Sequence, residues 1–267
     1  MLENNKRVTI YDIINKKSVQ SIVMITAYDA LFARLFDDYA DIILVGDSLN
    51  MSFNGKKDTL SLKMNDALYH VKAVLQGAKR AFVVADMPFG SYFSEKDALK
   101  NAAKFIKAGA DAVKFEGGLK AAPIVKRLAS EGINVMAHIG LMPQFVRNEG
   151  GYKIKGRSEA DEARLIEEAQ VLEHAGAFSA VLEGTVSSVA AKIAKSVKIP
   201  IIGIGAGADV DGQVLVWSDM LGFFDEFKPK FVKRYLDGAN LVRTAVETYA
   251  REVREKTFPC EEFEYKI

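Results

Sequence analysis

The chain has 267 residues, of which 49% are hydrophobic and 27% charged, a composition typical of folded globular proteins and not of disordered chains. Thirty-six Lys and Arg residues against 35 Asp and Glu leave a formal charge of +1, without the basic excess that would indicate a nucleic-acid partner. The single cysteine, Cys260, excludes an internal disulfide, and since we find neither a signal-peptide core at residues 1–9 nor a run that could span a bilayer, we expect a cytoplasmic protein without membrane contact.

Short apolar runs alternate along the chain with longer stretches of helical periodicity. In chain order the expected strands are 21–28, 41–48, 81–87, 112–117, 134–141, 178–184 and 199–205, with a weaker eighth at 213–217. Most of these runs are apolar throughout, as are strands of a parallel sheet that is covered on both faces. Eight such βα units predict one α/β domain over residues 1–267, a closed (β/α)₈ or TIM barrel.

Helix signals between the runs agree with this repeat. The clearest helix is expected at 158–175, with Leu165, Ala169 and Leu172 on its inward face. Three glycines follow helical stretches shortly before the next strand, where a left-handed residue would end the helix: Gly109, Gly132 and Gly176. Similar stops after separate helices support one repeating unit.

Two additions flank the repeats, an N-terminal extension at 1–20 and a C-terminal helix and tail at 235–267. The late helix has an apolar stripe formed by Val242, Val246, Tyr249 and Val253. Because eight units already close a barrel, this stripe must cover either the bottom of the barrel or a neighbouring subunit. We favour the subunit contact, and therefore a homo-oligomer.

Polar residues close five of the apolar runs: Asp47 with Ser48, then Asp86, Glu116, His138 and Glu183. The carboxyl ends of barrel strands share one mouth, where the catalytic residues of such enzymes collect. We therefore expect these side chains to surround one pocket.

Three of them are acids from adjacent strands. Asp47, Asp86 and Glu116 would repel one another in a cavity of low dielectric, so either some are protonated or a cation lies between them. Oxygen ligands without cysteine favour Mg²⁺. The alternative is that each acid caps a following helix or pairs with a nearby lysine, but three neighbouring acids favour the metal.

The remaining polar residues have a functional and a structural interpretation each. Lys114 precedes Glu116 by two positions and so points to the same side of its strand; it could contact a substrate carboxylate or an enolate oxygen, or form a structural ion pair. His138 could donate to a substrate oxygen or be a hydrogen-bonded core histidine. Glu183 would lie opposite the acids, which suits a base better than a metal ligand, although it could simply accept backbone N–H groups.

Six motifs in fixed order resemble the ketopantoate hydroxymethyltransferase family. They lie at residues 26–29 (TAYD), 44–49 (LVGDSL), 113–118 (VKFEGG), 138–141 (HIGL), 150–153 (GGYK) and 202–207 (IGIGAG). The resemblance spans residues 23 to 231. Several motifs in one order are more specific than any of them alone.

This resemblance implies an enzyme of pantothenate synthesis that transfers the one-carbon unit of the co-substrate 5,10-methylenetetrahydrofolate to the 2-oxo acid 3-methyl-2-oxobutanoate, giving 2-dehydropantoate. It also implies Mg²⁺ and assembly as a decamer. By motif, Asp47 and Asp86 match metal ligands that also contact substrate, Glu116 the third acid of the metal site, Ser48, Lys114 and His138 substrate contacts, and Glu183 the catalytic base.

Two departures from the family pattern bear on the pocket. Met142 stands where a threonine is common, and residues 184–185 replace a small or sulfur-containing residue and an apolar neighbour.

The alternatives to a hydroxymethyltransferase are a 2-oxo acid lyase of the isocitrate lyase and phosphoenolpyruvate mutase type, or an inactive binding barrel. Such lyases usually carry a cysteine at the mouth, whereas Cys260 lies beyond the barrel, and the presence of every proposed catalytic group opposes loss of activity.

Overall fold

The computed structural model describes residues 6–225 and 228–265. Residues 1–5 of the predicted N-terminal extension and 266–267 of the predicted tail lie outside the described residues. The chain forms two compact units, Met1–Val216 and Trp217–Ile267. The prediction of one domain over residues 1–267 stays a prediction.

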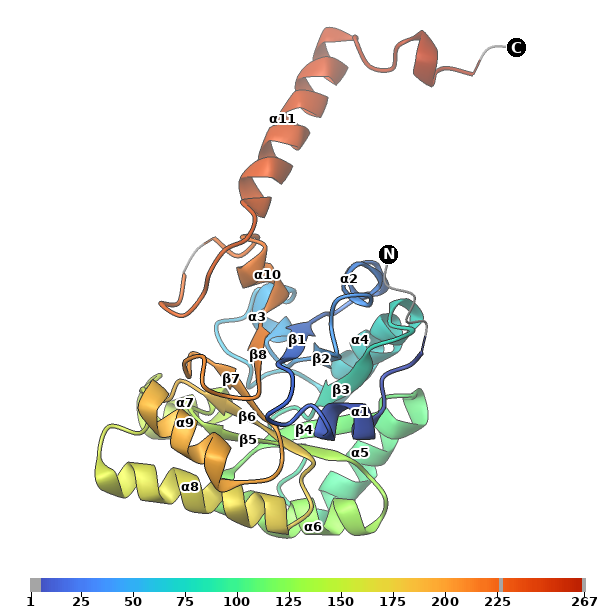
Figure 1. The fold of residues 1–267 in the computed structure, drawn as a ribbon. Coiled ribbons are helices and arrows are strands. Elements are labelled where there is room, and N and C mark those ends of the chain that lie inside the picture. The colour runs from blue at the N-terminus through green and yellow to red at the C-terminus, as the bar shows by residue number, and fades with distance from the viewer. Residues whose placement is uncertain (1–5, 226–227, 266–267) are drawn as a thin grey trace. The chain divides into compact units, whose positions relative to one another are not determined.

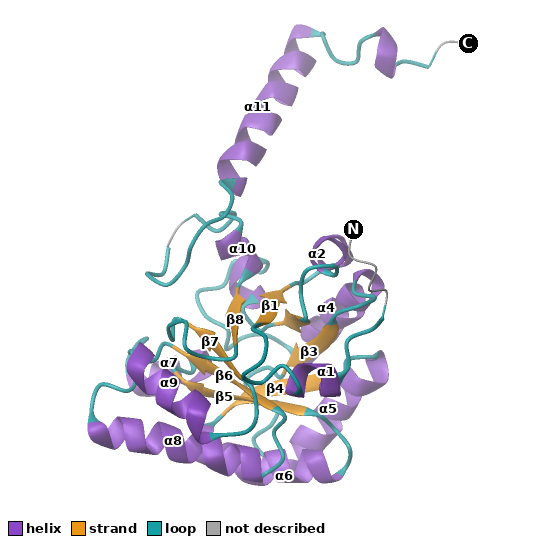
Figure 2. Cartoon of the chain, in the orientation of Figure 1, coloured by secondary structure: helices purple, strands orange, loops and turns teal. Residues whose placement is uncertain are grey.

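Eight parallel strands form a closed barrel in the order of the chain, and β8 pairs with β1 (Figure 2). They are β1 (Ile22–Thr26), β2 (Ile42–Val45), β3 (Phe82–Asp86), β4 (Ala112–Glu116), β5 (Val135–Gly140), β6 (Ser179–Glu183), β7 (Ile201–Ile204) and β8 (Gly212–Leu215). All eight predicted runs are therefore confirmed, including the weaker one, whose strand starts at Gly212, one residue earlier than expected. The predicted (β/α)₈ barrel is confirmed with them.

Helices surround the strands on the outside of the barrel (Figure 1). The helical segments of this unit are α1 (Ile10–Ile14), α2 (Ala30–Phe36), α3 (Leu49–Ser52), α4 (Met64–Gly77), α5 (Glu95–Ala108), η1 (Gly118–Ala121), α6 (Ala122–Ser130), η2 (Pro143–Phe145), α7 (Val146–Glu149), α8 (Glu159–His174) and α9 (Ser187–Ser196). The predicted helix at 158–175 is α8, and its expected inward residues Leu165, Ala169 and Leu172 are fully buried. It begins after Ser158, whose side chain accepts from the backbone N–H of Asp161 at 3.2 Å and so satisfies one of the free amides of the first turn.

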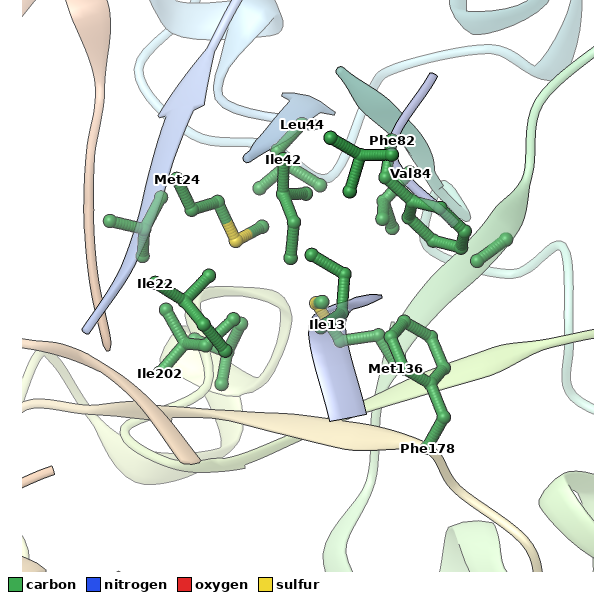
Figure 3. Packing of buried hydrophobic residues seen from close by; sticks show 14 of the residues in the cluster. Ile13, Ile22, Met24, Ile42, Leu44, Phe82, Val84, Met136, Phe178 and Ile202 are labelled. Carbon is green, nitrogen blue, oxygen red and sulfur yellow. The ribbon is translucent and has the colours of Figure 1, made fainter. Parts of the chain in front are cut away.

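The short helix α1 covers the amino end of the barrel. Ile13 is fully buried there, within an apolar cluster that includes the first residues of β1, β2 and β3 (Figure 3). Its neighbours in the cluster include Ile22, Ile42, Phe82, Met136 and Phe178. The barrel bottom, one of the two surfaces that the sequence left open for the late apolar stripe, is thus covered by the N-terminal extension.

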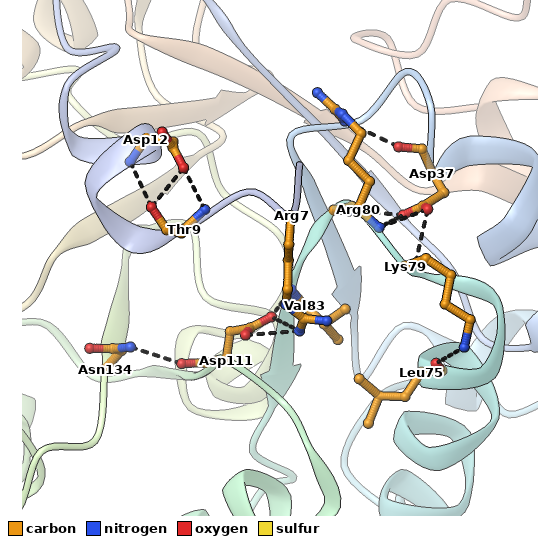
Figure 4. Close-up of polar contacts among 11 residues, drawn as sticks. Arg7, Thr9, Asp12, Asp37, Leu75, Lys79, Arg80, Val83, Asp111 and Asn134 are labelled. Atoms are coloured by element: carbon orange, nitrogen blue, oxygen red, sulfur yellow. Dashed lines mark hydrogen bonds and ion pairs between the residues drawn. The ribbon is translucent and has the colours of Figure 1, made fainter. Parts of the chain in front are cut away.

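Polar contacts fix this N-terminal segment in place (Figure 4). The guanidinium of Arg7 lies 2.9 Å from both carboxylate oxygens of Asp111, the residue directly before β4. Thr9 caps α1, since its side chain accepts from the backbone N–H of Asp12 while the Asp12 carboxylate accepts from the backbone N–H of Thr9. This reciprocal capping box fixes the start of α1, so that Ile13 faces the core.

The second unit contains α10 (Trp217–Met220), α11 (Gly238–Glu255) and the turn η3 (Glu261–Phe263). The predicted late helix is confirmed as α11, and Gly238 is its buried residue. The four residues of the predicted stripe, Val242, Val246, Tyr249 and Val253, are 44–59% exposed. Among the described helices, none combines the length and apolarity that crossing a bilayer requires.

Candidate active site

The predicted site residues come together at the carboxyl ends of β2 to β6. Asp86, Glu116 and Glu183 are the last residues of β3, β4 and β6. Within the sheet, Asp86 lies opposite Lys114, and Glu116 lies opposite His138. The parallel register therefore converts positions spread along the sequence into neighbours in one pocket.

Lys114 and Asp86 form a buried ion pair. Lys114 Nζ lies 2.8 Å from Asp86 Oδ2, and the two side chains are 4% and 2% exposed. Burial raises the pKa of Asp86 to about 7, and the charge of Asp47 adds to this effect while Lys114 opposes it. Burial lowers the pKa of Lys114, but Asp86, Asp47 and Glu116 more than offset that and leave it raised. Lys114 is therefore the cation among these acids at neutral pH.

Gln144 joins two of the acids and was missed by the sequence analysis. Its side-chain amide donates to Asp47 Oδ2 at 2.9 Å and to the carbonyl of Met87 at 3.1 Å, and its backbone N–H donates to Glu116 Oε2 at 3.0 Å. Tyr92 completes the group by donating its hydroxyl to Gln144 Oε1 at 2.5 Å. Gln144 lies in the turn η2, not at a strand end, so strand periodicity gave no signal for it.

His138 lies between the lysine and Glu183. Its Nδ1 is 3.3 Å from Lys114 Nζ, and its Nε2 is 3.4 Å from Glu183 Oε2. Burial, with the charge of Lys114, holds the imidazole pKa well below its usual value, so the ring is neutral. Because an ammonium only donates, Nδ1 must accept and Nε2 carries the hydrogen. The Nε2–H group therefore points toward the side of the pocket where Glu183 lies.

Glu183 has the environment of a base that works near neutral pH. Its side chain is 18% exposed, and burial, with the charge of Asp47, raises its pKa to about 8 against the influence of Lys114. Its carbonyl accepts from the backbone N–H of Leu141 at 2.9 Å. Gly140 permits this approach, since its φ is +88° and a Cβ there would stand 2.3 Å from that carbonyl oxygen.

Ser48 is held by Tyr28, which follows the neighbouring strand β1. Its hydroxyl lies 2.8 Å from that of Tyr28, which is fully buried and also accepts from the Thr26 hydroxyl at 3.2 Å. Asp29 in the same motif caps α2 by accepting from the backbone N–H of Phe32 at 2.9 Å. The conspicuous TAYD motif thus orients Ser48 and starts a helix.

The loop after α7 reaches the rim beside Glu183. Lys155 donates its backbone N–H to the carbonyl of Gly184 at 2.8 Å, and its ammonium pairs with Glu149 at 2.5 Å. Thr185, one of the departures from the family pattern, is buried and donates its hydroxyl to the carbonyl of Glu183 at 3.0 Å. This departure therefore fixes the backbone that carries Glu183.

The three acids fit a hard cation by their chemistry. Asp86 Oδ1 is buried without a hydrogen-bond partner, and burial together with Asp47 raises the pKa of Glu116 well above its usual value. Both facts indicate that Lys114 alone does not neutralise the negative charge of these carboxylates. As the side chains are placed, however, no three His, Cys, Asp or Glu residues within the described ranges stand close enough to hold one ion.

Comparison with known proteins supports one family over nearly the whole chain. The family model described as ketopantoate hydroxymethyltransferase matches residues 7–261. A protein of Campylobacter concisus named 3-methyl-2-oxobutanoate hydroxymethyltransferase is 67% identical over 98% of this chain and 97% of its own length. A protein of the same name from Helicobacter pylori is 56% identical over 96% and 95%.

Solved structures share the fold at much lower identity. Phosphonopyruvate hydrolase is 13% identical with a TM-score of 0.64 over 97% of this chain and 92% of that chain. The 2,3-dimethylmalate lyase, of the phosphoenolpyruvate mutase and isocitrate lyase superfamily, is 14% identical with a TM-score of 0.58 over 96% and 91%. These likenesses show the barrel, whereas the family model and the close relatives show the family. The chain belongs to the ketopantoate hydroxymethyltransferase family.

Proposed function

We propose that the protein transfers the one-carbon unit of 5,10-methylenetetrahydrofolate to 3-methyl-2-oxobutanoate, giving 2-dehydropantoate for pantothenate synthesis. The observation that carries this proposal is the line of four side chains across the mouth. Asp86, Lys114, His138 and Glu183 follow one another at 2.8, 3.3 and 3.4 Å. In this row Glu183, a carboxyl of raised pKa, lies at the opposite end from Lys114 and Asp86. Proton abstraction beside a carbonyl requires such a base on one side and a positive group on the other.

The substrate oxygens have donors in this pocket. Lys114 supplies an ammonium, His138 an Nε2–H group, and Ser48 a hydroxyl that Tyr28 orients. A 2-oxo acid presents a carboxylate and a keto oxygen side by side, so several donors can hold it in one orientation. The C3–H group of the bound oxo acid would then face Glu183.

Asp47 and Asp86, with Glu116 as the third acid, would hold Mg²⁺, which when bound polarises the keto group and makes the C3 hydrogen more acidic. A protein of the same fold, phosphonopyruvate hydrolase, has been solved with oxalate and Mg²⁺ together. Two observations support a divalent cation here: Asp86 Oδ1 has no hydrogen-bond partner, and the pKa of Glu116 is raised well above its usual value.

Glu183 then acts as the base. It removes the C3 proton, while Lys114 and the His138 N–H stabilise the negative charge that develops on the keto oxygen. The resulting C3 nucleophile forms a bond to the methylene carbon, and both bonds from that carbon to the two folate nitrogens break. Water supplies the hydroxyl oxygen of the product, and the two nitrogens take up one proton from this water and the proton that Glu183 removed. A pKa of about 8 for Glu183 leaves a useful ionised fraction near neutral pH and a carboxylate basic enough for the task.

A lyase of the phosphoenolpyruvate mutase and isocitrate lyase type is the second candidate, because the solved structures with this fold include such enzymes. The relatives at 56–67% identity favour the transferase. An assay for cleavage of 2-methylisocitrate separates the two, since only the lyase would split it into a C4 acid and a C3 acid.

We also propose that the protein assembles as a homo-oligomer, specifically a decamer, in the cytoplasm. The exposed stripe of α11 supports the oligomer, since a row of apolar side chains on one helix face is typical of a contact surface. The number of subunits rests on the family resemblance.

The decisive test is enolisation without folate. The purified protein is incubated with 3-methyl-2-oxobutanoate in D₂O, with Mg²⁺ or with EDTA, and loss of the C3 hydrogen signal is followed by proton NMR. We expect exchange that requires both the protein and Mg²⁺. A folded protein that gives no exchange with Mg²⁺ would contradict the proposal.

A further inference from the structure

A hollow of about 570 Å³ opens beside the acid group on the strand-end side of the barrel. It lies among the loops that follow β2, β3 and β5, and its lining includes Leu60, Phe89, Phe93, Gln144, Phe145 and Arg147. Its volume is within the range of about 300–1,000 Å³ that small-molecule sites occupy. The hollow is therefore large enough to hold a second substrate while the small oxo acid occupies the catalytic pocket.

The hollow is connected to the catalytic residues through one side chain. Gln144 lines it, and the side-chain amide of this residue donates to Asp47 at 2.9 Å. A molecule that fills the hollow would thus contact a residue that is hydrogen-bonded to the acid group. This is the placement that the second substrate of a transfer reaction requires.

The lining is suited to a flat aromatic ring. Phe89 and Phe93 are 41% and 68% exposed, although their rings contact each other edge to face at 5.1 Å. Phe145 adds a third ring from the loop after β5. Single exposed aromatic residues are ordinary, but three around one hollow offer faces and edges on which a planar ring can stack.

The rim of the hollow is polar and carries positive charge. Ser61 and Asn148 supply hydrogen-bonding groups. Arg147 is paired with Asp58 at 3.0 Å, but its side chain is 76% exposed and so remains accessible to a further anion. Polar groups around an apolar lining suit a heteroaromatic ring with hydrogen-bonding edges and an anionic tail.

We propose that this hollow binds the heteroaromatic ring of the one-carbon donor, with Phe89 and Phe93 as its stacking surface. The proposal rests on the proposed function, which makes that donor a reduced pterin carrying a carboxylate tail. Ring stacking there would present the donor's methylene carbon to the oxo acid past Gln144. Phe89 and Phe93 are then residues that determine which donor is accepted.

The test compares Phe93→Ala and Phe89→Ala with Tyr39→Ala, a control that removes a similarly exposed ring, 75% exposed, from outside the hollow. Tetrahydrofolate binding is measured by calorimetry, with 6-methyltetrahydropterin as a second probe that lacks the tail. We expect each phenylalanine variant to weaken both Kd values and to raise the KM for the folate donor by about tenfold, since a lost stacking contact has this size. The KM for the oxo acid and the circular dichroism spectrum should stay near wild type, and Tyr39→Ala should change none of these.

Unchanged affinity for both probes in both phenylalanine variants would overturn this assignment of the hollow, whatever the catalytic activity. Failure of the proposed function is a separate result, because it would appear as absent C3 exchange in the wild-type protein, in an assay that contains no folate.

Discussion

Glu183 combines a partly open position with a strongly shifted pKa. Burial, together with the charge of Asp47, raises that pKa to about 8, and Lys114 opposes the shift. A base acts only in its ionised form, so we expect C3 exchange at saturating Mg²⁺ to rise with pH and then to level off. The midpoint should lie below the metal-free pKa of about 8, because the bound cation offsets the charge of Asp47. Glu183→Gln should slow exchange by about 100-fold or more. Both effects are measured by proton NMR in D₂O from pH 6 to 9.5.

The matched control is Glu162→Gln, which changes an acid on the outer helix α8 that pairs with Lys192 at the surface. It should leave both the rate and the pH profile unchanged. A flat profile in the wild type, or exchange in Glu183→Gln at the wild-type rate, would mean that another group removes the proton.

Strand-end residues were predictable because their position follows from a local pattern. An apolar run that is buried on both faces and closed by Asp86 or Glu183 places that residue at the barrel mouth whatever the loops do. Gln144 was not predictable in this way. It contacts Asp47 and Tyr92, which are 97 and 52 positions away, so its role depends on how three loops pack and not on any period in the sequence.

The short helix α1 closes the amino end of the barrel, because its residue Ile13 is fully buried in the apolar cluster there. We expect Ile13→Ala to lower the free energy of unfolding by about 2–5 kcal/mol, since it removes a large side chain from a packed core. Tyr11→Ala on the same helix alters a residue that is 73% exposed and should change stability by less than about 0.5 kcal/mol. Denaturant unfolding followed by circular dichroism gives both values.

Equal stability of the two variants would show that α1 does not contribute to the core.

This helix also illustrates a limit of sequence-based prediction. It has 5 residues, fewer than two turns, so it presents no repeating apolar face. The strands were predicted from continuous apolar runs, which need no period, and the 16-residue α8 is long enough to show its helical period.

For the whole molecule, the exposed stripe of α11 predicts self-association. We expect light scattering to give a mass well above the 29.4 kDa of one chain. Val246 is 59% exposed on that stripe, and Val246→Asp should reduce the mass by placing a charge in an apolar contact. Glu247→Gln, on the same helix, should leave it unchanged. A wild-type monomer at working concentration would contradict the proposed assembly.

The acids at the mouth should make the stability of the metal-free protein depend on pH. The pKa of Asp86 is raised to about 7 from an unfolded value near 3.8, so the folded state binds this proton more tightly. Its contribution to stability is therefore full below about pH 4 and is lost as pH rises through about 7. Mg²⁺ should reverse the loss, because a cation binds the ionised carboxylates of the folded protein.

We expect thermal unfolding from pH 5 to 8 to show a Tm that falls with pH without metal and that Mg²⁺ raises most at pH 8. Asp86→Asn should reduce both the pH slope and the effect of Mg²⁺. Asp219→Asn is the matched control, since burial also raises the pKa of Asp219, to about 6, but in the second unit, where Arg234 is the opposing charge. It should reduce the slope and leave the Mg²⁺ effect intact. If Mg²⁺ raised the Tm of Asp86→Asn as much as that of the wild type, Asp86 would not be a metal ligand, and the raised pKa would reflect burial beside Asp47 alone.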